Sequence, residues 1–170
     1  QGNKEGLKNA LKTPDDTRGE PPLDLPAKIA DQLLPVMDME KGGLQGAPKF
    51  PQTGLLNVLW RAHISTNKES FSAAVDKALT HMCEGGIYDH LAGGFSRYSV
   101  DAEWLAPHFE KMLYDNALLI SLLTEVWSET KNNLYATRVT ETIDWLKSEM
   151  LTPEGAFSAS LDADSEGEEG

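Results

Sequence analysis

The sequence predicts an all-α fold built from helical hairpins, and three observations lead to it. Four segments carry apolar residues at the 3.6-residue spacing of an amphipathic helix. No segment alternates apolar and polar residues over more than four positions, as a half-buried strand would. A glycine break followed by an apolar or aromatic residue recurs at residues 42–44, 93–95 and 155–157. Loops that repeat in this way between helices indicate a helical array.

The first two predicted helices occupy the N-terminal third of the chain. Apolar residues favour a short helix over residues 25–34, which Pro35 kinks or ends because proline cannot donate the helical hydrogen bond. Residues 46–51 are too rich in proline for a helix or a central strand, so they form a fixed loop. Thr53 is predicted to be the N-cap of a second helix that reaches about Ser65.

The third predicted helix shows the clearest amphipathic pattern. Thr66 and Glu69 have the spacing of a capping box at its start. Gly85 stands where a helix C-terminal glycine belongs. The residues predicted to face the core are Phe71, Ala74, Val75, Ala78, Leu79 and Met82.

Two more helices are predicted toward the C-terminus. One runs from about Pro107 to Ser128, with Pro107 and His108 in its first turn. Its middle, residues 117–123, is apolar on nearly every side, which predicts burial inside a larger assembly of helices. The last helix begins at a cap formed by Asn132 or Asn133 and ends at residues 153–155.

Composition excludes several classes of protein. The chain has 170 residues, with 15 Lys and Arg against 27 Asp and Glu, for a net charge of −12. Nucleic acid and anionic membranes are therefore not expected as partners, because both require clustered cations. No apolar run approaches the roughly 20 residues that span a bilayer. Cys83 is the single cysteine, which excludes an internal disulfide and a paired-cysteine zinc site. We expect no metal, no cofactor and a cytoplasmic location.

Polar residues that could support chemistry concentrate in residues 85–101 and 107–116. Histidine acts as acid or base near neutral pH, so His90 and His108 stand out. His108, Lys111 and Asp115 are predicted to share one helical face. The alternative is structural: Asp89 caps a turn, Arg97 bridges loop carbonyls, and Lys111 pairs with Asp115. Residues 162–167 imitate half of a calcium loop, but a solvated acidic loop fits better because position five is glutamate.

Four motifs together resemble one known family. They are residues 46–51, 85–100, 107–117 and 162–170. They resemble the spermatogenesis-associated protein 20 family, also called domain of unknown function 255, and the likeness covers about residues 25–170. The resemblance implies an N-terminal thioredoxin-like domain joined to an (α/α)6 toroid similar to N-acylglucosamine 2-epimerases and other six-hairpin sugar enzymes.

That resemblance also implies a domain organisation and a partner. Residues 1–22, polar and rich in proline and glycine, are expected to be a linker or frayed arm. Residues 23–170 are expected to be the N-terminal part of the toroid, cut from a longer polypeptide. The thioredoxin-like domain and the remaining hairpins would then be missing. Apolar surface left where those hairpins dock would promote self-association.

The family resemblance supplies no settled reaction, so two hypotheses stay open. In the first, the toroid binds a sugar and acts like an epimerase or a glycoside hydrolase. In the related epimerases, histidines move a proton at the carbon beside the sugar carbonyl, which makes His90 and His108 the acid/base candidates. Substrate-orienting candidates are Asp89, Arg97, Tyr98 and Asp115. In the second hypothesis, the helices are a non-catalytic scaffold that works beside a thioredoxin-like domain.

Overall fold

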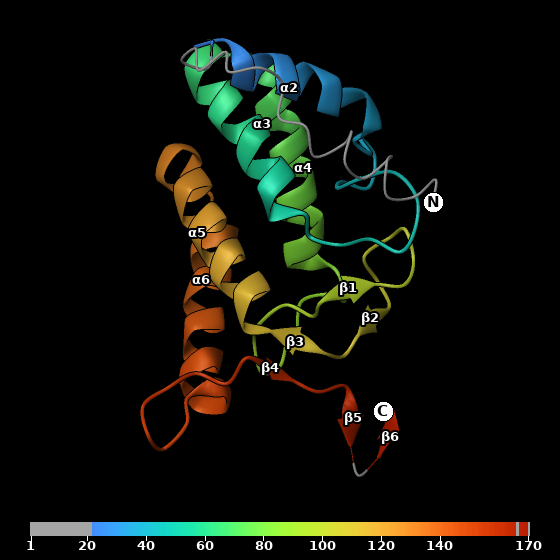
Figure 1. Ribbon diagram of the computed structural model, residues 1–170, viewed down its shortest axis with the longest axis vertical. Helices are drawn as coiled ribbons and strands as arrows, with labels where there is room; N and C mark the ends of the chain where they lie inside the picture. The colour runs from blue at the N-terminus through green and yellow to red at the C-terminus, as the bar shows by residue number, and fades with distance from the viewer. Residues whose placement is uncertain (1–21, 166, 170) are drawn as a thin grey trace, which may run out of the picture.

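The computed structural model describes residues 22–165 and 167–169, so nearly all of the predicted linker at 1–22 lies outside the described residues. Over these described residues the fold is helical, as predicted, and the strands form only short antiparallel pairs (Figure 1). The helical segments are α2 (Leu25–Leu33), η1 (Leu34–Val36), α3 (Thr53–Thr66), α4 (Glu69–Glu84), α5 (Leu113–Thr130), α6 (Asn133–Trp145) and η2 (Leu146–Met150). The strand pairs are β1 (Tyr98–Ser99) with β2 (Pro107–His108), β3 (Lys111–Met112) with β4 (Ser160–Leu161), and β5 (Asp164–Ser165) with β6 (Glu168–Glu169).

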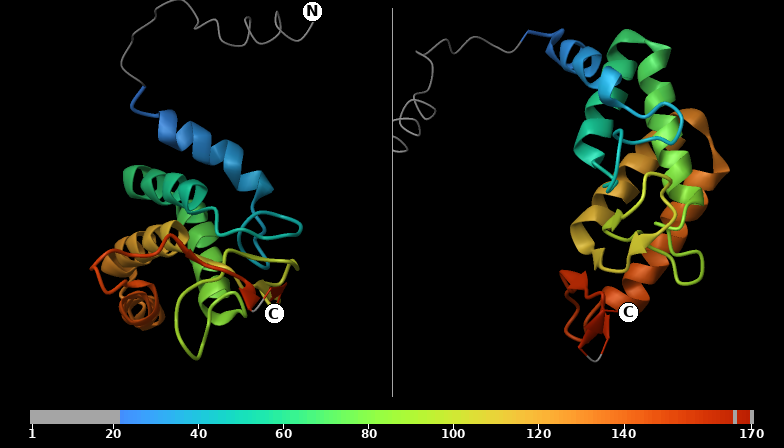
Figure 2. Two further views of the ribbon diagram at one scale, coloured as in Figure 1. Left: turned by 60° about the horizontal axis from the view of Figure 1, so that its bottom comes forward. Right: turned by 90° about the vertical axis from the view of Figure 1, so that its right-hand side faces the viewer.

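The longer helices pack in two layers. Helix α3 lies against α5, and α4 lies against α6, as the right-hand view of Figure 2 shows. Helices α3 and α4 form one antiparallel hairpin, and α5 and α6 form the next. Short turns join the helices at one end of each hairpin, and long loops with the strand pairs gather at the other end (Figure 1). The loop end is therefore where irregular polar segments from distant parts of the sequence meet.

The two short turns have the same construction. Asn67 after α3 and Lys131 after α5 both adopt left-handed backbone, with φ of 56° and 55°. Before each of them a threonine hydroxyl, of Thr66 or Thr130, donates to the carbonyl four residues back and accepts the N–H two residues ahead. The predicted capping box is wrong, because Thr66 ends α3 and does not open α4. The predicted asparagine cap is confirmed, since the Asn132 side chain accepts from the N–H of Leu134.

The long loops confirm the glycine repeat. Each of the three glycine segments is closed by one antiparallel bridge, between Met37 and Leu44, between Tyr88 and Phe95, and between Leu151 and Phe157. Glycines in all three loops have φ near +80°, a conformation that residues with a Cβ rarely adopt. The repeat therefore marks the same structural event, a tight loop that follows a helical segment and leads the chain back across the loop end.

A lysine and a tryptophan secure the first two of these loops. Lys49 Nζ donates to the Asp38 carboxylate at 2.8 Å and to the carbonyl of Gly42 at 2.6 Å. Lys111 Nζ makes the same two contacts in the second loop. It donates to the Asp89 carboxylate and to the carbonyl of Gly93, both at 2.8 Å. Each ammonium also lies over an indole ring, of Trp104 in the first loop and of Trp145 in the second.

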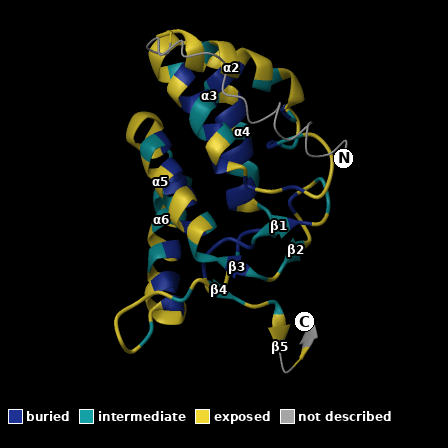
Figure 3. Ribbon diagram, in the orientation of Figure 1, coloured by how far each residue is buried: buried dark blue, intermediate teal, exposed yellow. Residues whose placement is uncertain are grey.

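The core confirms the amphipathic pattern of α4. All six residues predicted to face inward are buried there, together with Cys83. Leu119, Leu122, Leu123 and Val126 bury the corresponding face of α5. Burial runs along the facing sides of the helices and into the loop end (Figure 3). No helix in the described part of the chain is long and apolar enough to cross a membrane.

The start of α5 differs from the prediction. The helix begins at Leu113, and Pro107 and His108 belong to β2, where they pair with Ser99 and Tyr98. Local signals favour a helix from the proline, but pairing with β1 satisfies the backbone of these residues in an extended form. Helix α5 is also buried on one face only in this chain, because Leu118 remains 47% exposed.

Candidate functional site

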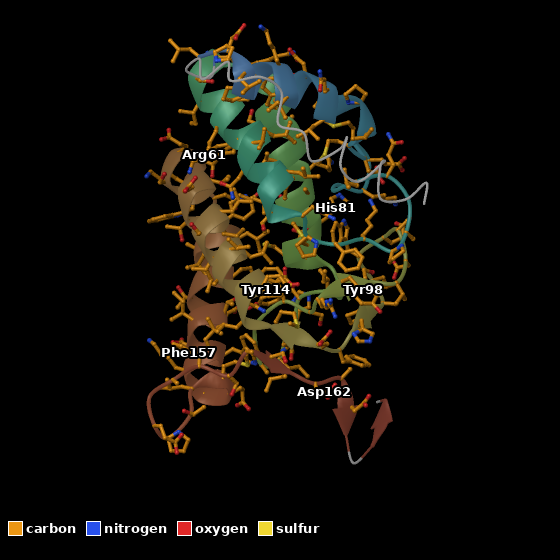
Figure 4. All side chains as sticks on the ribbon, viewed as in Figure 1. Arg61, His81, Tyr98, Tyr114, Phe157 and Asp162 are labelled. Atoms are coloured by element: carbon orange, nitrogen blue, oxygen red, sulfur yellow. The ribbon has the colours of Figure 1, made fainter. Side chains whose placement is uncertain are left out.

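A row of three aromatic rings lies at the loop end. The pairing of β1 with β2 sets Tyr98 opposite His108, and their rings stack at 4.8 Å between centroids with 13° between planes. A bridge between Lys49 and Ser99 brings Phe50 alongside, so that its ring lies 4.9 Å from that of Tyr98. Figure 4 shows Tyr98 at the same end of the molecule as Tyr114. The rings come from two segments nearly fifty residues apart, which no local pattern in the sequence could pair.

An ion pair stands next to the rings. Arg97 Nη1 donates to Glu110 Oε2 at 2.8 Å, and the Arg97 N–H donates to the Glu110 carbonyl, also at 2.8 Å. The hydrogen bond and the charge of Glu110 raise the pKa of the Arg97 guanidinium above its usual value. The Arg97 side chain remains 43% exposed while that of Glu110 is 21% exposed, so the guanidinium is held by Glu110 and stays partly open to solvent. Tyr114 is a further hydrogen-bond partner of Arg97. Sequence reasoning singled out Arg97 but missed Glu110.

Asp115 lies in the first turn of α5 beside this pair. Burial raises the pKa of its carboxyl, and the negative charge of Glu110 adds to that rise. A hydrogen bond with Tyr114 and the positive charge of Arg97 act in the opposite direction. A carboxyl group that is held partly toward its neutral form near a cation is a candidate for acid/base work. The predicted helical face shared with His108 does not exist, because His108 precedes the helix.

Asp89 has a structural role, as in the alternative interpretation in which it caps a turn. Its Oδ1 accepts the N–H groups of Leu91 and Ala92 at 2.9 and 3.0 Å, which caps the tight turn. Its Oδ2 accepts Lys111 Nζ. Burial works to raise the pKa of this carboxyl, but the lysine and the two backbone donors together hold it at about 2. Lys111 is therefore paired with Asp89, and the predicted Lys111–Asp115 pair is wrong.

His90 lies at the other side of the same loop, against α6. Its Nε2 lies 3.0 Å from the carbonyl of Gly85, and its Nδ1 lies 3.2 Å from Arg138 Nη2. Because Arg138 can only donate, Nδ1 accepts and Nε2 carries the proton. Glu141 Oε2 accepts both from Arg138 at 2.7 Å and from the Tyr88 hydroxyl at 2.6 Å. The Tyr88 bond comes first among the causes that lower the pKa of Glu141.

The two helix residues in this network carry little local signal. Arg138 and Glu141 are an i, i+3 pair of opposite charge on α6, a spacing that is usually a solvent-exposed pair. The Arg138 side chain is only 15% exposed, and its Nε donates to the carbonyl of Cys83 at 2.9 Å. Its partners Cys83 and His90 lie about fifty residues earlier, in α4 and in the loop that follows it, so only the tertiary packing of α6 against α4 reveals the network.

The predicted site residues thus fall into two groups. Arg97, Tyr98, His108 and Asp115 gather around β1, β2 and the start of α5, whereas Asp89 and His90 belong to the loop that packs on α6. His90 lines two hollows of about 200 and 340 Å³, and His108 lines neither of them. The two histidines therefore do not meet in either of these hollows. Among the described residues, no group of three or more His, Cys, Asp or Glu side chains is arranged to hold a metal ion.

Comparisons with known proteins identify relatives of this chain. It is 38% identical over 148 residues to spermatogenesis-associated protein 20 of Mus musculus, a match over 85% of the chain and 19% of the mouse protein. The human protein of the same name is 36% identical over 143 residues, or 82% of the chain and 18% of that protein. The chain is homologous to a segment of spermatogenesis-associated protein 20. The resemblance carried by the four motifs is thereby confirmed, and the chain spans about a fifth of the length of these relatives. No family model matches.

Solved structures that share this fold include sugar epimerases and a sugar isomerase. A sugar epimerase from a ruminal bacterium superposes with a TM-score of 0.68 at 16% identity, over 81% of this chain and 40% of that one. The cellobiose 2-epimerase of Spirochaeta thermophila gives 0.66 at 20% identity, over 83% and 41%. A D-mannose isomerase gives 0.61 at 14% identity, over 81% and 39%. At these identities the likeness shows the fold, which is part of an (α/α)6 toroid, as predicted.

Proposed function

We propose that this chain supplies one wall of a sugar-binding pocket in an (α/α)6 toroid, and that the pocket carries out acid/base chemistry of the epimerase or isomerase kind. The observation that carries the proposal is the cluster of Arg97, Tyr98, His108 and Asp115 at the loop end of the layer formed by α3 and α5. Stacked rings present apolar area to a sugar ring, while the guanidinium and the carboxyl orient its hydroxyls. The shared fold with sugar epimerases and a mannose isomerase supports this class of substrate.

The residues take different parts in this proposal. His108 and Asp115 are the groups that exchange a proton with the substrate, because imidazole is a common general acid or base in enzymes and burial raises the pKa of the Asp115 carboxyl. Arg97 and Tyr98 orient the sugar. His90, proposed from the sequence as the second acid/base group, and Asp89, proposed as a substrate ligand, hold the loop that presents this wall. In this proposal His90 does not contact the substrate; it positions the loop that does.

The second candidate function is a non-catalytic scaffold beside a thioredoxin-like domain. The bonding of Asp89 and His90 favours it, since both side chains are engaged with their own loop and with α6. A scaffold needs such rigid loops but has no need of a half-buried carboxyl beside an exposed guanidinium. The cluster around Arg97 therefore favours the sugar site over the scaffold.

Deuterium exchange tests the proposal. After the proton beside a sugar carbonyl is removed in D₂O, epimerisation returns deuterium to that same carbon. Aldose–ketose isomerisation instead places it on the former carbonyl carbon. The full-length natural protein should transfer deuterium into D-mannose, D-glucose or cellobiose, followed by proton NMR. His108→Asn should lower the exchange rate at least about a hundredfold, the usual contribution of an acid/base group.

A matched control separates chemistry from folding. His63→Asn changes a histidine of α3 whose Nδ1 lies 3.1 Å from the carbonyl of Lys68, near the short turn that leads into α4, and it should leave exchange unchanged. If the wild-type protein exchanges no deuterium and binds none of these sugars, the scaffold is the better account.

A further inference from the structure

Every cation of the strand segments at the loop end is matched by one carboxylate. Lys49 pairs with Asp38, Lys111 with Asp89, and Arg97 with Glu110, each at 2.8 Å. The three cations have similar backbone positions. Lys49 forms a β-bridge, Lys111 lies in strand β3, and Arg97 directly precedes strand β1. Matching of this kind leaves no cation in these segments with its charge uncompensated.

The three pairs differ in their access to solvent. The side chains of Lys49 and Lys111 are 1% and 11% exposed, and both also donate to a glycine carbonyl, so they secure their loops. The Arg97 side chain is 43% exposed and donates to no loop carbonyl in the described structure. Arg97 is therefore the one member of this set that can reach a ligand, and Glu110 sets the charge that the ligand meets there.

Asp115 adds a second carboxyl close to the same guanidinium. The charges of Arg97 and Glu110 both act on its pKa, so the three groups lie within electrostatic reach of one another. One cation beside two carboxyl groups gives a site that is neutral or negative, according to the protonation of Asp115. An anionic ligand at Arg97 would meet one carboxylate at the guanidinium and a second carboxyl beside it.

We propose that Glu110 is the specificity-determining residue of this site, and that it directs the pocket to uncharged sugars and against phosphorylated or carboxylated ones. The proposal rests on the proposed function, because it takes Arg97 to face the sugar. Glu110 does not exchange a proton with the substrate in this account. It neutralises Arg97, which keeps the guanidinium as a donor for hydroxyl and carbonyl oxygens and withdraws its attraction for anions.

Substitution of Glu110 gives a gain of binding that a purely structural role would not produce. In the full-length natural protein, D-mannose should bind more tightly than D-mannose 6-phosphate. Glu110→Gln should strengthen binding of the 6-phosphate and of inorganic phosphate about fivefold relative to binding of D-mannose, the scale of one partly exposed charge pair. Titrations followed by ligand and phosphorus NMR measure all three constants.

Two control variants make the result specific. Glu110→Asp keeps the negative charge and should keep the wild-type preference. Glu103→Gln removes a carboxylate that pairs with Lys41 at the surface and should change none of the constants. The thermal midpoint of each variant reports whether it is folded.

The outcomes separate this inference from the proposed function. If D-mannose binds but the 6-phosphate binds wild type as tightly, or Glu110→Gln leaves the ratio unchanged, Glu110 does not set specificity while the sugar site stands. If no sugar binds wild type but Glu110→Gln still gains affinity for inorganic phosphate, Glu110 screens Arg97 in a site whose proposed sugar function is wrong. If neither sugar nor phosphate responds in any variant, both proposals fall.

Discussion

Adding one methyl group at Gly94 is the sharpest test of how the loop end is held together. Gly94 has a φ of +84°, and a Cβ built on it would lie 2.6 Å from Cε3 and 2.8 Å from Cδ2 of Trp145. Trp145 is only 2% exposed, and Lys111 Nζ lies 4.9 Å from the centre of its ring. The indole therefore cannot move aside without disturbing the lysine that secures the same loop.

Two costs add in Gly94→Ala. The left-handed backbone costs a residue with a Cβ about 1–2 kcal/mol. Forcing an extra carbon against a buried ring costs a further ~1–3 kcal/mol. The loss of chain freedom in the unfolded state returns about 0.4–1 kcal/mol. The free energy of unfolding should therefore fall by about 1–5 kcal/mol, which can be a large part of the 5–15 kcal/mol that is typical of folded domains.

The chain offers two matched controls for this substitution. Gly46 has a φ of +90° and no heavy atom within 4 Å of the position that an added methyl would take, so Gly46→Ala carries the backbone cost alone, about 1 kcal/mol. Gly54 lies in α3 with open space around it, so Gly54→Ala should raise stability by about 0.5–1 kcal/mol. Urea unfolding followed by far-ultraviolet circular dichroism measures all three. Equal losses for Gly94→Ala and Gly46→Ala would refute the packing argument.

Buried polar contacts of the loop end supply three further predictions. Asn116→Ala should lower the free energy of unfolding by about 2–4 kcal/mol, because the buried Asn116 amide bonds both the N–H and the carbonyl of Phe95. Calorimetry against the change Asn133→Ala, at an exposed asparagine, checks this, and a loss below about 1 kcal/mol would contradict it. Lys111→Met should cost about 2–3 kcal/mol by leaving the Asp89 carboxylate without its partner, whereas Lys147→Met, which breaks an exposed pair with Asp144, should change urea stability by under ~0.5 kcal/mol. Asp89 has a folded pKa of about 2 against an ordinary 3.8, so the stability it contributes is present above pH 3.8 and is lost as the pH falls toward 2. In Asp89→Asn the free energy of unfolding should therefore depend less on pH over that interval. An unchanged pH dependence would show that Asp89 is not responsible.

Local pattern was sufficient for the helices that are amphipathic on their own. The α4 stripe, the asparagine cap of α6 and the glycine repeat all follow from spacing within a few residues, and the structure has each of them. The same reasoning failed where a short segment had two acceptable conformations. Pro107 and His108 suit the first turn of a helix, but β1 offers them hydrogen bonds that the helix start does not. The capping box predicted at Thr66 was wrong for a similar reason, because a threonine hydroxyl can also hydrogen-bond to a carbonyl at the end of a helix, as Thr66 does in α3.

The candidate site was only partly accessible to sequence reasoning. Residue type identified Arg97, Tyr98, His108 and Asp115, and the structure brings them to one end of the fold. Glu110 and Phe50 were missed because a carboxylate and an apolar ring are ordinary in a loop. Their roles depend on partners that the strand pairs bring close to them. In an irregular loop no periodic pattern in the sequence predicts which residue will be the partner.

The sequence by itself determined the helical class, the hairpin repeat and the likeness to spermatogenesis-associated protein 20, because each rests on spacing between neighbours or on long motifs. It also determined where the chain turns, since a glycine with positive φ is a property of the local backbone. Only the tertiary structure decided which carboxylate neutralises which cation, and that His90 and Asp89 separate from the cluster around Arg97. Those outcomes depend on contacts between segments tens of residues apart, whose energies are set by packing and burial and leave no local signature.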